Sequence, residues 1–167
     1  MLAVKNLSSR YSVRTIGAAD ICDVYDLYQQ NTAYYAYEKS EPTIETVQHD
    51  LTALPLKKEA HDKFYVGYYE NDALLAVMDL IRGYPDEKTI FIGLFMLRKS
   101  AQGRGIGTQI IEEAFDYLRQ AGFSYVRLGC IKGNIEGERF WKKQLFLPTG
   151  AEMQTDCYTV TVLQRPL

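Results

Sequence analysis

Cysteine and histidine, which build disulfide frameworks and many metal centres, are scarce in this sequence. The 167 residues include three cysteines and two histidines. Cys22, Cys130 and Cys157 are far apart and odd in number, so they have neither the spacing of a zinc site nor the pairing of a disulfide framework. We therefore expect no metal, and free thiols of the kind that cytoplasmic proteins keep reduced.

Long apolar runs and an excess of charge of one sign are absent too. The start, MLAVKNLSSR, has no apolar stretch of signal-peptide length, and no later run approaches the ~20 residues of a membrane span. With 19 Lys and Arg against 21 Asp and Glu, the net charge is -2, and no basic stripe would attract nucleic acid. We expect a cytoplasmic protein with neither a membrane nor a nucleic acid as its partner.

The composition that is present is that of an ordinary globular domain. Hydrophobic residues make up 47% and charged residues 24% of the chain, and thirteen tyrosines are many for this length. No linker, repeat or low-complexity tract divides the sequence. We expect residues 1–167 to form one domain.

Helical and strand patterns follow one another along the chain. Apolar spacing predicts helices capped by Asp20, started by Thr43, and following Gly107 as far as Gly122, with 31–42 as a loop between the first two. A short helix is predicted within 134–146. Strands are predicted at 11–16, 63–70, 73–84, 89–97, 125–131 and 157–167. The strand at 89–97 is apolar on both faces, which indicates a central, fully covered strand of a mixed α/β sheet.

The segment KSAQGRGIGTQIIEEAF, 99–115, joins that central strand to the third helix. Its glycines alternate at Gly103, Gly105 and Gly107. A helix start has about four unpaired N–H groups and the positive end of the helix dipole, and glycines let an anion approach them. Thr108 stands where a P-loop needs lysine and a dinucleotide fingerprint needs its third glycine, so both are excluded. The pattern predicts a phosphate-binding turn rather than a plain connection.

Two segments carry a resemblance to a known family. QGRGIG, 102–107, resembles the Gln/Arg-x-x-Gly-x-Gly/Ala signature of the GNAT superfamily of acetyl-coenzyme A dependent N-acetyltransferases. NIEGERFWKKQLF is similar to that family's later segment, with Asn134, Phe140 and Phe146 at matching places. The order of elements is similar across nearly the whole chain. The resemblance implies a GNAT-like single α/β (α+β) domain, whose mixed, mostly antiparallel central sheet has helices on both faces.

The resemblance also implies where acetyl-coenzyme A would bind, as a cosubstrate without a metal. Backbone N–H groups of 103–108 would hold the pyrophosphate, and the end of the central strand would bond the pantetheine arm like a further strand. Asn134 would reach the arm from its other side. The implied cofactor-binding residues are Met96, Leu97, Gln102, Gly103, Arg104, Gly105, Ile106, Gly107, Thr108, Asn134 and Trp141.

The chain departs from the family at the usual catalytic positions. Trp141 stands where the family often has a tyrosine that protonates the leaving thiolate, and an indole is too weak an acid for that role. Phe91 stands where some members have a glutamate base. Leu145 replaces a glycine, so the turn after that helix is expected to differ. Tyr158 is the candidate replacement acid.

Asp79 is the candidate base, because it interrupts the apolar run ALLAVMDLI. The predicted hairpin places it opposite Gly93 or Leu94, near the middle of the central strand. Burying a carboxylate costs free energy unless it is paired, so a buried Asp79 favours a functional role for this residue. The alternative is a structural Asp79, exposed or paired with Arg82 or Arg98.

The acceptor is predicted from the same resemblance. Tyr34, Tyr35 and Tyr84 are candidates for lining its site, and Glu38 and Glu41 would suit a cationic amine. The implied function is direct transfer of an acetyl group to a primary amine of a small molecule or peptide. The alternative is a coenzyme-A-binding sensor or structural domain without turnover, consistent with the substitutions at the catalytic positions. The sequence does not decide whether the protein forms a homodimer.

Overall fold

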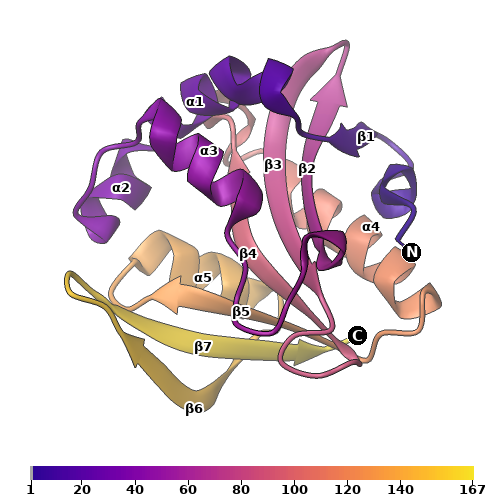
Figure 1. The fold of residues 1–167 in the computed structure, drawn as a ribbon, viewed down its shortest axis with the longest axis vertical. Coiled ribbons are helices and arrows are strands. Elements are labelled where there is room, and N and C mark those ends of the chain that lie inside the picture. The colour runs from indigo at the N-terminus through magenta and orange to yellow at the C-terminus, as the bar shows by residue number, and fades with distance from the viewer. Residues whose placement is uncertain (1) are drawn as a thin grey trace.

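The computed structural model describes residues 2–167, which form one seven-stranded sheet with the strand order β1-β2-β3-β4-β5-β7-β6 (Figure 1). Five pairs of neighbouring strands are antiparallel, and β4 and β5 are parallel. The sheet is therefore mixed and mostly antiparallel, as predicted. The strands are β1 (Ser12–Thr15), β2 (Lys63–Glu70), β3 (Ala73–Arg82), β4 (Thr89–Leu97), β5 (Tyr125–Ile131), β6 (Leu147–Gln154) and β7 (Thr159–Pro166).

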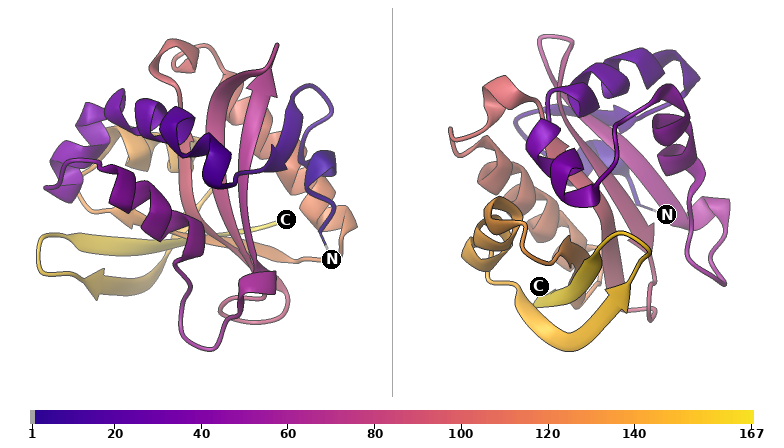
Figure 2. Two further views of the ribbon diagram at one scale, coloured as in Figure 1. Left: turned by 45° about the horizontal axis from the view of Figure 1, so that its top comes forward. Right: turned by 90° about the vertical axis from the view of Figure 1, so that its left-hand side faces the viewer.

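Helices cover both faces of the sheet. α1, α2 and α3 lie on one face, and α4 and α5 lie on the other (Figure 2). Their bounds are α1 (Ile21–Gln29), α2 (Thr32–Glu38), α3 (Ile44–Thr52), α4 (Ile106–Gln120) and α5 (Ile135–Lys143). Short 3-10 turns complete the described chain: η1 (Val4–Leu7), η2 (Ala18–Asp20), η3 (Ala60–Asp62) and η4 (Lys99–Ala101). This arrangement confirms the predicted fold class.

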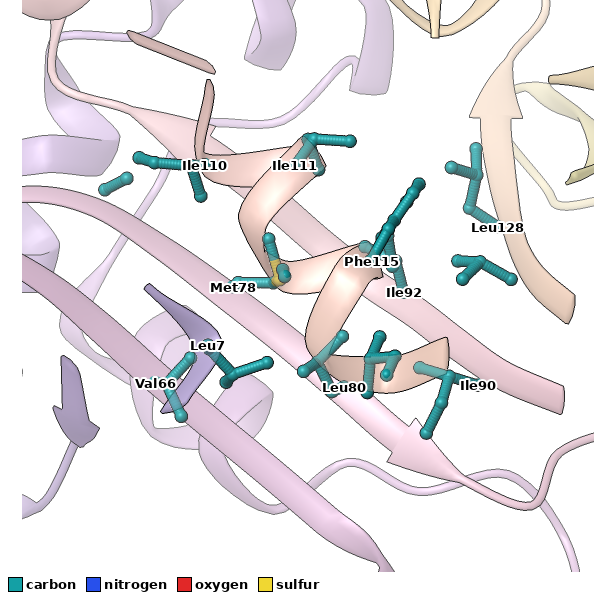
Figure 3. Packing of buried hydrophobic residues seen from close by; sticks show 14 of the residues in the cluster. Leu7, Val66, Met78, Leu80, Ile90, Ile92, Ile110, Ile111, Phe115 and Leu128 are labelled. Carbon is teal, nitrogen blue, oxygen red and sulfur yellow. The ribbon is translucent and has the colours of Figure 1, made fainter. Parts of the chain in front are cut away.

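The larger core lies under α4. Ile110, Ile111 and Phe115 project from this helix onto side chains of β3, β4 and β5, among them Met78 and Leu128 (Figure 3). All five are at most 1% exposed. Burying each such side chain stabilises the fold by about 1.5–3 kcal/mol, so this packing fixes the start of α4 against the end of β4.

Two expectations about the first half of the chain were wrong. The predicted loop contains α2, because Tyr35 packs against Tyr28 with ring centroids 5.8 Å apart, and such packing outweighs the weak helix propensity of aromatic residues. Asp20 does precede α1, but its carboxylate does not cap the helix. It accepts hydrogen bonds from the Gly17 N–H and from Arg14 instead.

The second half of the chain differs from expectation at two strands. β6 was not predicted, because all eight of its residues are exposed and the strand has no alternation of buried and exposed positions. β4 is central, as predicted, but it is not fully covered. Thr89, Ile90 and Ile92 are buried in its first half, whereas Gly93 is exposed and Leu94, Phe95 and Leu97 are half-buried. The reason is that β5 does not follow β4 to its end.

Candidate functional site

The parallel strands β4 and β5 part near their middle. They are paired only from Thr89 with Tyr125 to Ile92 with Leu128. Figure 1 shows them starting side by side near the C-terminus and diverging. Gly93 is an extra residue in the β3–β4 ladder at this point, because Asp79 faces Leu94 and the next residue of β3 already faces Ile92. Beyond this bulge, both strands present unpaired backbone edges to each other.

A cavity of about 530 Å³ lies where the strands part, bounded by the ends of β4 and β5 and the first turns of α4 and α5. The predicted cofactor-binding residues line it, except Arg104 and Ile106. Arg104 is exposed in the turn, and Ile106 packs against the core under α4. The structure thus brings residues 96–108 together with 134–141, as the resemblance implied.

The direction of the backbone N–H and C=O groups decides which residues of β4 face its unpaired edge. The N–H of Arg98 donates to the carbonyl of Leu75 in β3, at 2.7 Å. Successive residues point to opposite sides, so the polar groups of Phe95 and Leu97 point away from β3, toward the parted edge, and those of Met96 point toward β3. The N–H and carbonyl of Phe95 and the N–H of Leu97 therefore offer the backbone contacts that an extended ligand would use, and Phe95 was missed from sequence.

Side-chain amides hold the end of β4 in place. The carbonyl of Leu97 accepts from Nδ2 of Asn31 at 3.0 Å and from Nε2 of Gln102 at 3.1 Å, and Nε2 of Gln102 also donates to Oδ1 of Asn31. Gln102 thus stabilises the turn through its side chain. Asn31 was missed, because a lone asparagine between two helices carries no pattern of its own.

The glycine turn bares the start of α4. Gly103 and Gly105 have φ angles of 71° and 79°, in the left-handed region, and a Cβ at either would meet no atom within 4 Å. The first intrahelical hydrogen bond runs from the N–H of Gln109 to the carbonyl of Gly105. The N–H groups of the three residues before Gln109 therefore have no partner within the helix and can receive an anion.

Gly107 has a different role from the other two glycines. A Cβ at this position would lie 3.4 Å from side-chain atoms of Leu97 and Phe140. The absence of a side chain therefore lets α4 approach β4 and α5 closely. One glycine serves packing and two leave the open space that a pyrophosphate requires.

Asn134 is the N-cap of α5 and Trp141 lies within that helix. Oδ1 of Asn134 accepts from the N–H of Gly137 at 3.0 Å and caps the helix. The ring of Trp141 packs at 4.9–6.1 Å from the rings of Phe95, Phe140 and Phe146. These contacts favour packing as the role of Trp141. Leu145 adopts a φ of 63°, in the left-handed region that favours glycine.

Asp79 lies beside the bulge on the face of α1 and α3. It is 7% exposed, and a Cβ at Gly93 would overlap its carboxylate, so glycine makes room for it. Both carboxylate oxygens accept from Nζ of Lys63 at 2.9 Å. The expected partners were wrong, because Arg82 binds Asp62 and Arg98 binds a backbone carbonyl. Burial raises the pKa of Asp79 to about 6, against the opposing effect of Lys63.

The four candidate tyrosines are distributed over three places. Tyr34 lines the cavity and packs edge-on against Tyr35, with ring centroids 5.2 Å apart. Tyr158 lines an adjoining cavity of about 290 Å³, and burial raises the pKa of its hydroxyl. Tyr84 packs against Phe91 at the β3–β4 connection and lines neither of these two cavities.

Cys130 was not predicted to lie at the site, yet it lines the larger cavity from β5. It is 5% exposed, and burial raises the pKa of its thiol to about 11. The group is therefore a neutral thiol at neutral pH and a poor nucleophile. Within residues 2–167, no group of three or more potential metal ligands occurs, and no helix is long and apolar enough to cross a membrane.

Parted parallel strands that lead to a glycine-lined helix start form a site whose shape suits an extended, phosphate-bearing ligand. The sequence profile of the Acetyltransferase (GNAT) family matches residues 23–146. The chain therefore belongs to the GNAT acetyltransferase family. No curated protein matches the sequence significantly.

Three solved structures show the same fold. An acetyltransferase from Thermus thermophilus is 22% identical, with a TM-score of 0.76 and coverage of 94% of this chain and 97% of that one. An acetyltransferase from Salmonella typhimurium that modifies the N-terminal serine of ribosomal protein L7/L12 is 17% identical, with a TM-score of 0.72 and coverage of 96% and 97%. PaiA N-acetyltransferase from Thermoplasma acidophilum, in complex with coenzyme A, is 16% identical, with a TM-score of 0.67 and coverage of 94% and 99%.

Proposed function

We propose that the chain transfers an acetyl group from acetyl-coenzyme A to a primary amine, by direct attack of the amine on the thioester. The observation that carries this proposal is the continuity of the site. The open edge of β4 leads directly to the bared start of α4, so one cavity offers strand-like contacts to a pantetheine arm and N–H groups to a pyrophosphate.

Several groups of the chain would hold the cosubstrate. N–H groups of 103–108 would bind the pyrophosphate, the edge of Phe95 and Leu97 would bind the arm, and Asn134 would lie on its other side. An N–H of the parted edge is also suited to stabilise the oxyanion that develops on the thioester carbonyl. Such positioning supplies much of the rate of an acyl transfer.

The amine must lose a proton before it attacks, because an alkylammonium group with a pKa near ~10 has little free base at neutral pH. Asp79 is the candidate base, since its carboxylate lies beside the bulge at which the strands part and its pKa is raised to about 6. Tyr158, in the adjoining cavity, is the candidate acid for the leaving thiolate. Tyr34 and Tyr35, with Tyr84 at the β3–β4 connection, remain candidates for contacting the acceptor.

The acceptor is proposed as a small-molecule or peptide amine, and the reaction as cytoplasmic, in line with the three free cysteines. A structurally similar protein modifies an N-terminal serine, which makes peptide N-termini reasonable test substrates. The second candidate function is a coenzyme-A sensor without turnover, which is consistent with Trp141 and Phe91 at the usual catalytic positions.

The two functions are separated by measuring thiol release from acetyl-coenzyme A. The panel comprises an alkylamine, a polyamine, a lysine-containing peptide and a peptide with a free N-terminal serine. Amine-dependent release supports transfer. Coenzyme A binding by calorimetry without amine-dependent release would favour the sensor, and the absence of binding would overturn both.

A further inference from the structure

Five polar side chains, three of them buried and two half-buried, form a cluster between α1, α3, β2 and β3, on the face of the sheet that these two helices cover. They are Tyr28, Asp50, Lys63, Tyr65 and Asp79. Tyr28 is fully buried and Tyr65 is 3% exposed, so the hydroxyls between the two carboxylates lie away from water. The cluster contains two carboxylates and a single lysine, which leaves one negative charge without a cation in the cluster.

The hydrogen bonds give the two carboxylates different surroundings. The hydroxyl of Tyr28 donates to Oδ2 of Asp50 at 2.7 Å and lies 2.6 Å from the hydroxyl of Tyr65. A phenol has one hydrogen, so Tyr65 must donate to Tyr28 while Tyr28 donates to Asp50. Asp50 therefore ends a chain of two aligned hydroxyls, each of which favours its ionised form.

Among the described residues 2–167, no hydroxyl donates to Asp79. Its hydrogen bonds within this part of the chain come from Lys63, which also donates to the carbonyl of Ala53 at 2.8 Å. Asp79 also lies beside the bulge at which β4 and β5 part, whereas Asp50 belongs to α3. The two groups thus differ in their hydrogen-bond donors and in the element that carries them.

We propose that Asp50 is a positioning residue of the acceptor side: kept ionised by Tyr28 and Tyr65, its fixed charge makes Asp79 the carboxylate that takes the proton of the acceptor amine. The inference rests on the proposed acetyl transfer. In this step, one proton leaves the ammonium group and bonds to an oxygen of Asp79, and the nitrogen keeps the electron pair with which it attacks. Asp50 remains a carboxylate throughout.

The groups around Asp50 oppose the effect of its burial. Burial raises the pKa of Asp50 above its usual value, the Tyr28 hydrogen bond, His49 and Lys63 offset part of this rise, and the charge of Asp50 raises the pKa of Asp79. Two carboxylates in unlike surroundings commonly divide into a group that stays ionised and one that exchanges a proton. The titratable groups that face Asp50 are Tyr28, Tyr34, Tyr35, His49, Lys63, Tyr65, Asp79 and Tyr158.

The test is the pH dependence of kcat/KM in Asp50→Asn. Removing the charge lowers the pKa of Asp79, so the acid limb of the profile should move to lower pH. The ratio of kcat/KM at pH 5 to kcat/KM at pH 8 should be about threefold higher in the variant than in the native protein. This change corresponds to a shift of the acid limb by about half a pH unit. An acid limb that stays in place would overturn the inference, because a purely structural role would lower the melting temperature without moving it.

Tyr28→Phe is the second variant, in case Asp50→Asn does not fold. It removes the donor to Asp50, so Asp50 becomes protonated more easily and the acid limb should move in the same direction. Tyr69→Phe is the matched control, since its buried hydroxyl has no partner within residues 2–167, and it should leave the profile unchanged. Equal shifts in both tyrosine variants would overturn the inference.

A readout without turnover separates this inference from the proposed function. The carboxyl carbon of Asp79 can be titrated by NMR in the native protein and in Asp50→Asn. A native protein that releases no thiol with any amine contradicts the proposed transfer, whereas an Asp79 titration that is the same in both proteins contradicts the coupling.

Discussion

The coenzyme side and the acceptor side of the parted strands use different parts of the chain. On the proposed coenzyme side the candidate binding groups belong to the backbone, bared by Gly103 and Gly105 and by the open edge of β4. On the proposed acceptor side the candidate groups are side chains, foremost Asp79, which is buried and paired with Lys63. A backbone site needs particular residues at a particular spacing, whereas a side-chain site can be assembled from any neighbouring strands. The backbone site can therefore be predicted from the sequence, and the side-chain site cannot.

Gly105→Glu is the largest expected perturbation of the coenzyme side. The new side chain and its negative charge would enter the space proposed for the pyrophosphate. We expect coenzyme A affinity to fall by at least about 100-fold, or about 2.7 kcal/mol, as measured by titration calorimetry.

Gly122→Glu is the matched control for that variant. Gly122 follows the other end of α4, has a φ of 93°, and has the same open surroundings as Gly105. Both variants should lose similar stability through left-handed strain, but Gly122→Glu should keep its coenzyme affinity. Equal losses of affinity would show that the effect is strain rather than occupation of the cradle.

Asp79→Asn is the corresponding change on the acceptor side. The base must be ionised to act, so native kcat/KM should rise with pH through about 6, the raised pKa of Asp79. We expect the variant to lose about 100-fold in kcat/KM at neutral pH and to lose this inflection, with unchanged coenzyme affinity. A lower melting temperature with an unaltered profile would assign Asp79 to the scaffold.

Tyr158→Phe should have a smaller effect. A thiolate is a good leaving group that can also take its proton from water, so loss of the acid should lower kcat by about tenfold. Single-turnover kinetics at saturating coenzyme measures this loss. Tyr37→Phe, a tyrosine of the same adjoining cavity, is the control and should leave kcat unchanged.

Trp141→Phe should have the smallest effect on turnover. Its ring packs among three phenylalanines, so the variant should lose about 1–3 kcal/mol of stability while kcat changes by much less than the ~100-fold of a lost general acid. Chemical denaturation and steady-state kinetics check the two halves of this expectation. A 100-fold fall in kcat with intact folding would show that the indole takes part in the chemistry.

The sequence predicted the fold class and most of the coenzyme side, because both depend on local patterns. β2, β4 and β5 begin and end where their apolar runs do, and the glycine turn precedes α4 as expected. The misses lie where tertiary contacts decide. α2 forms because Tyr35 has a partner on α1, and β6 pairs with β7 without burying a residue.

The acceptor side was only partly predictable. The predicted register placed Asp79 opposite Gly93 or Leu94, and the structure pairs it with Leu94, because the β3–β4 connection limits the pairing. Its partner Lys63 was missed, since an exposed-looking lysine at the start of a strand gives no sign that its ammonium group reaches across to β3. Asn31 and Asp50 were missed for a similar reason, as each acts through contacts with a distant element.

The short ladder between β4 and β5 has a mechanical consequence. Four paired positions join the block that runs from β1 to β4 with the block that runs from β5 to β7, and the core under α4 spans both. The parted edges are thus the weakest connection within the sheet. A ligand hydrogen-bonded to both edges would link the two blocks, so amide exchange at 93–97 and 129–131 should slow on coenzyme A binding. The two blocks should then unfold together.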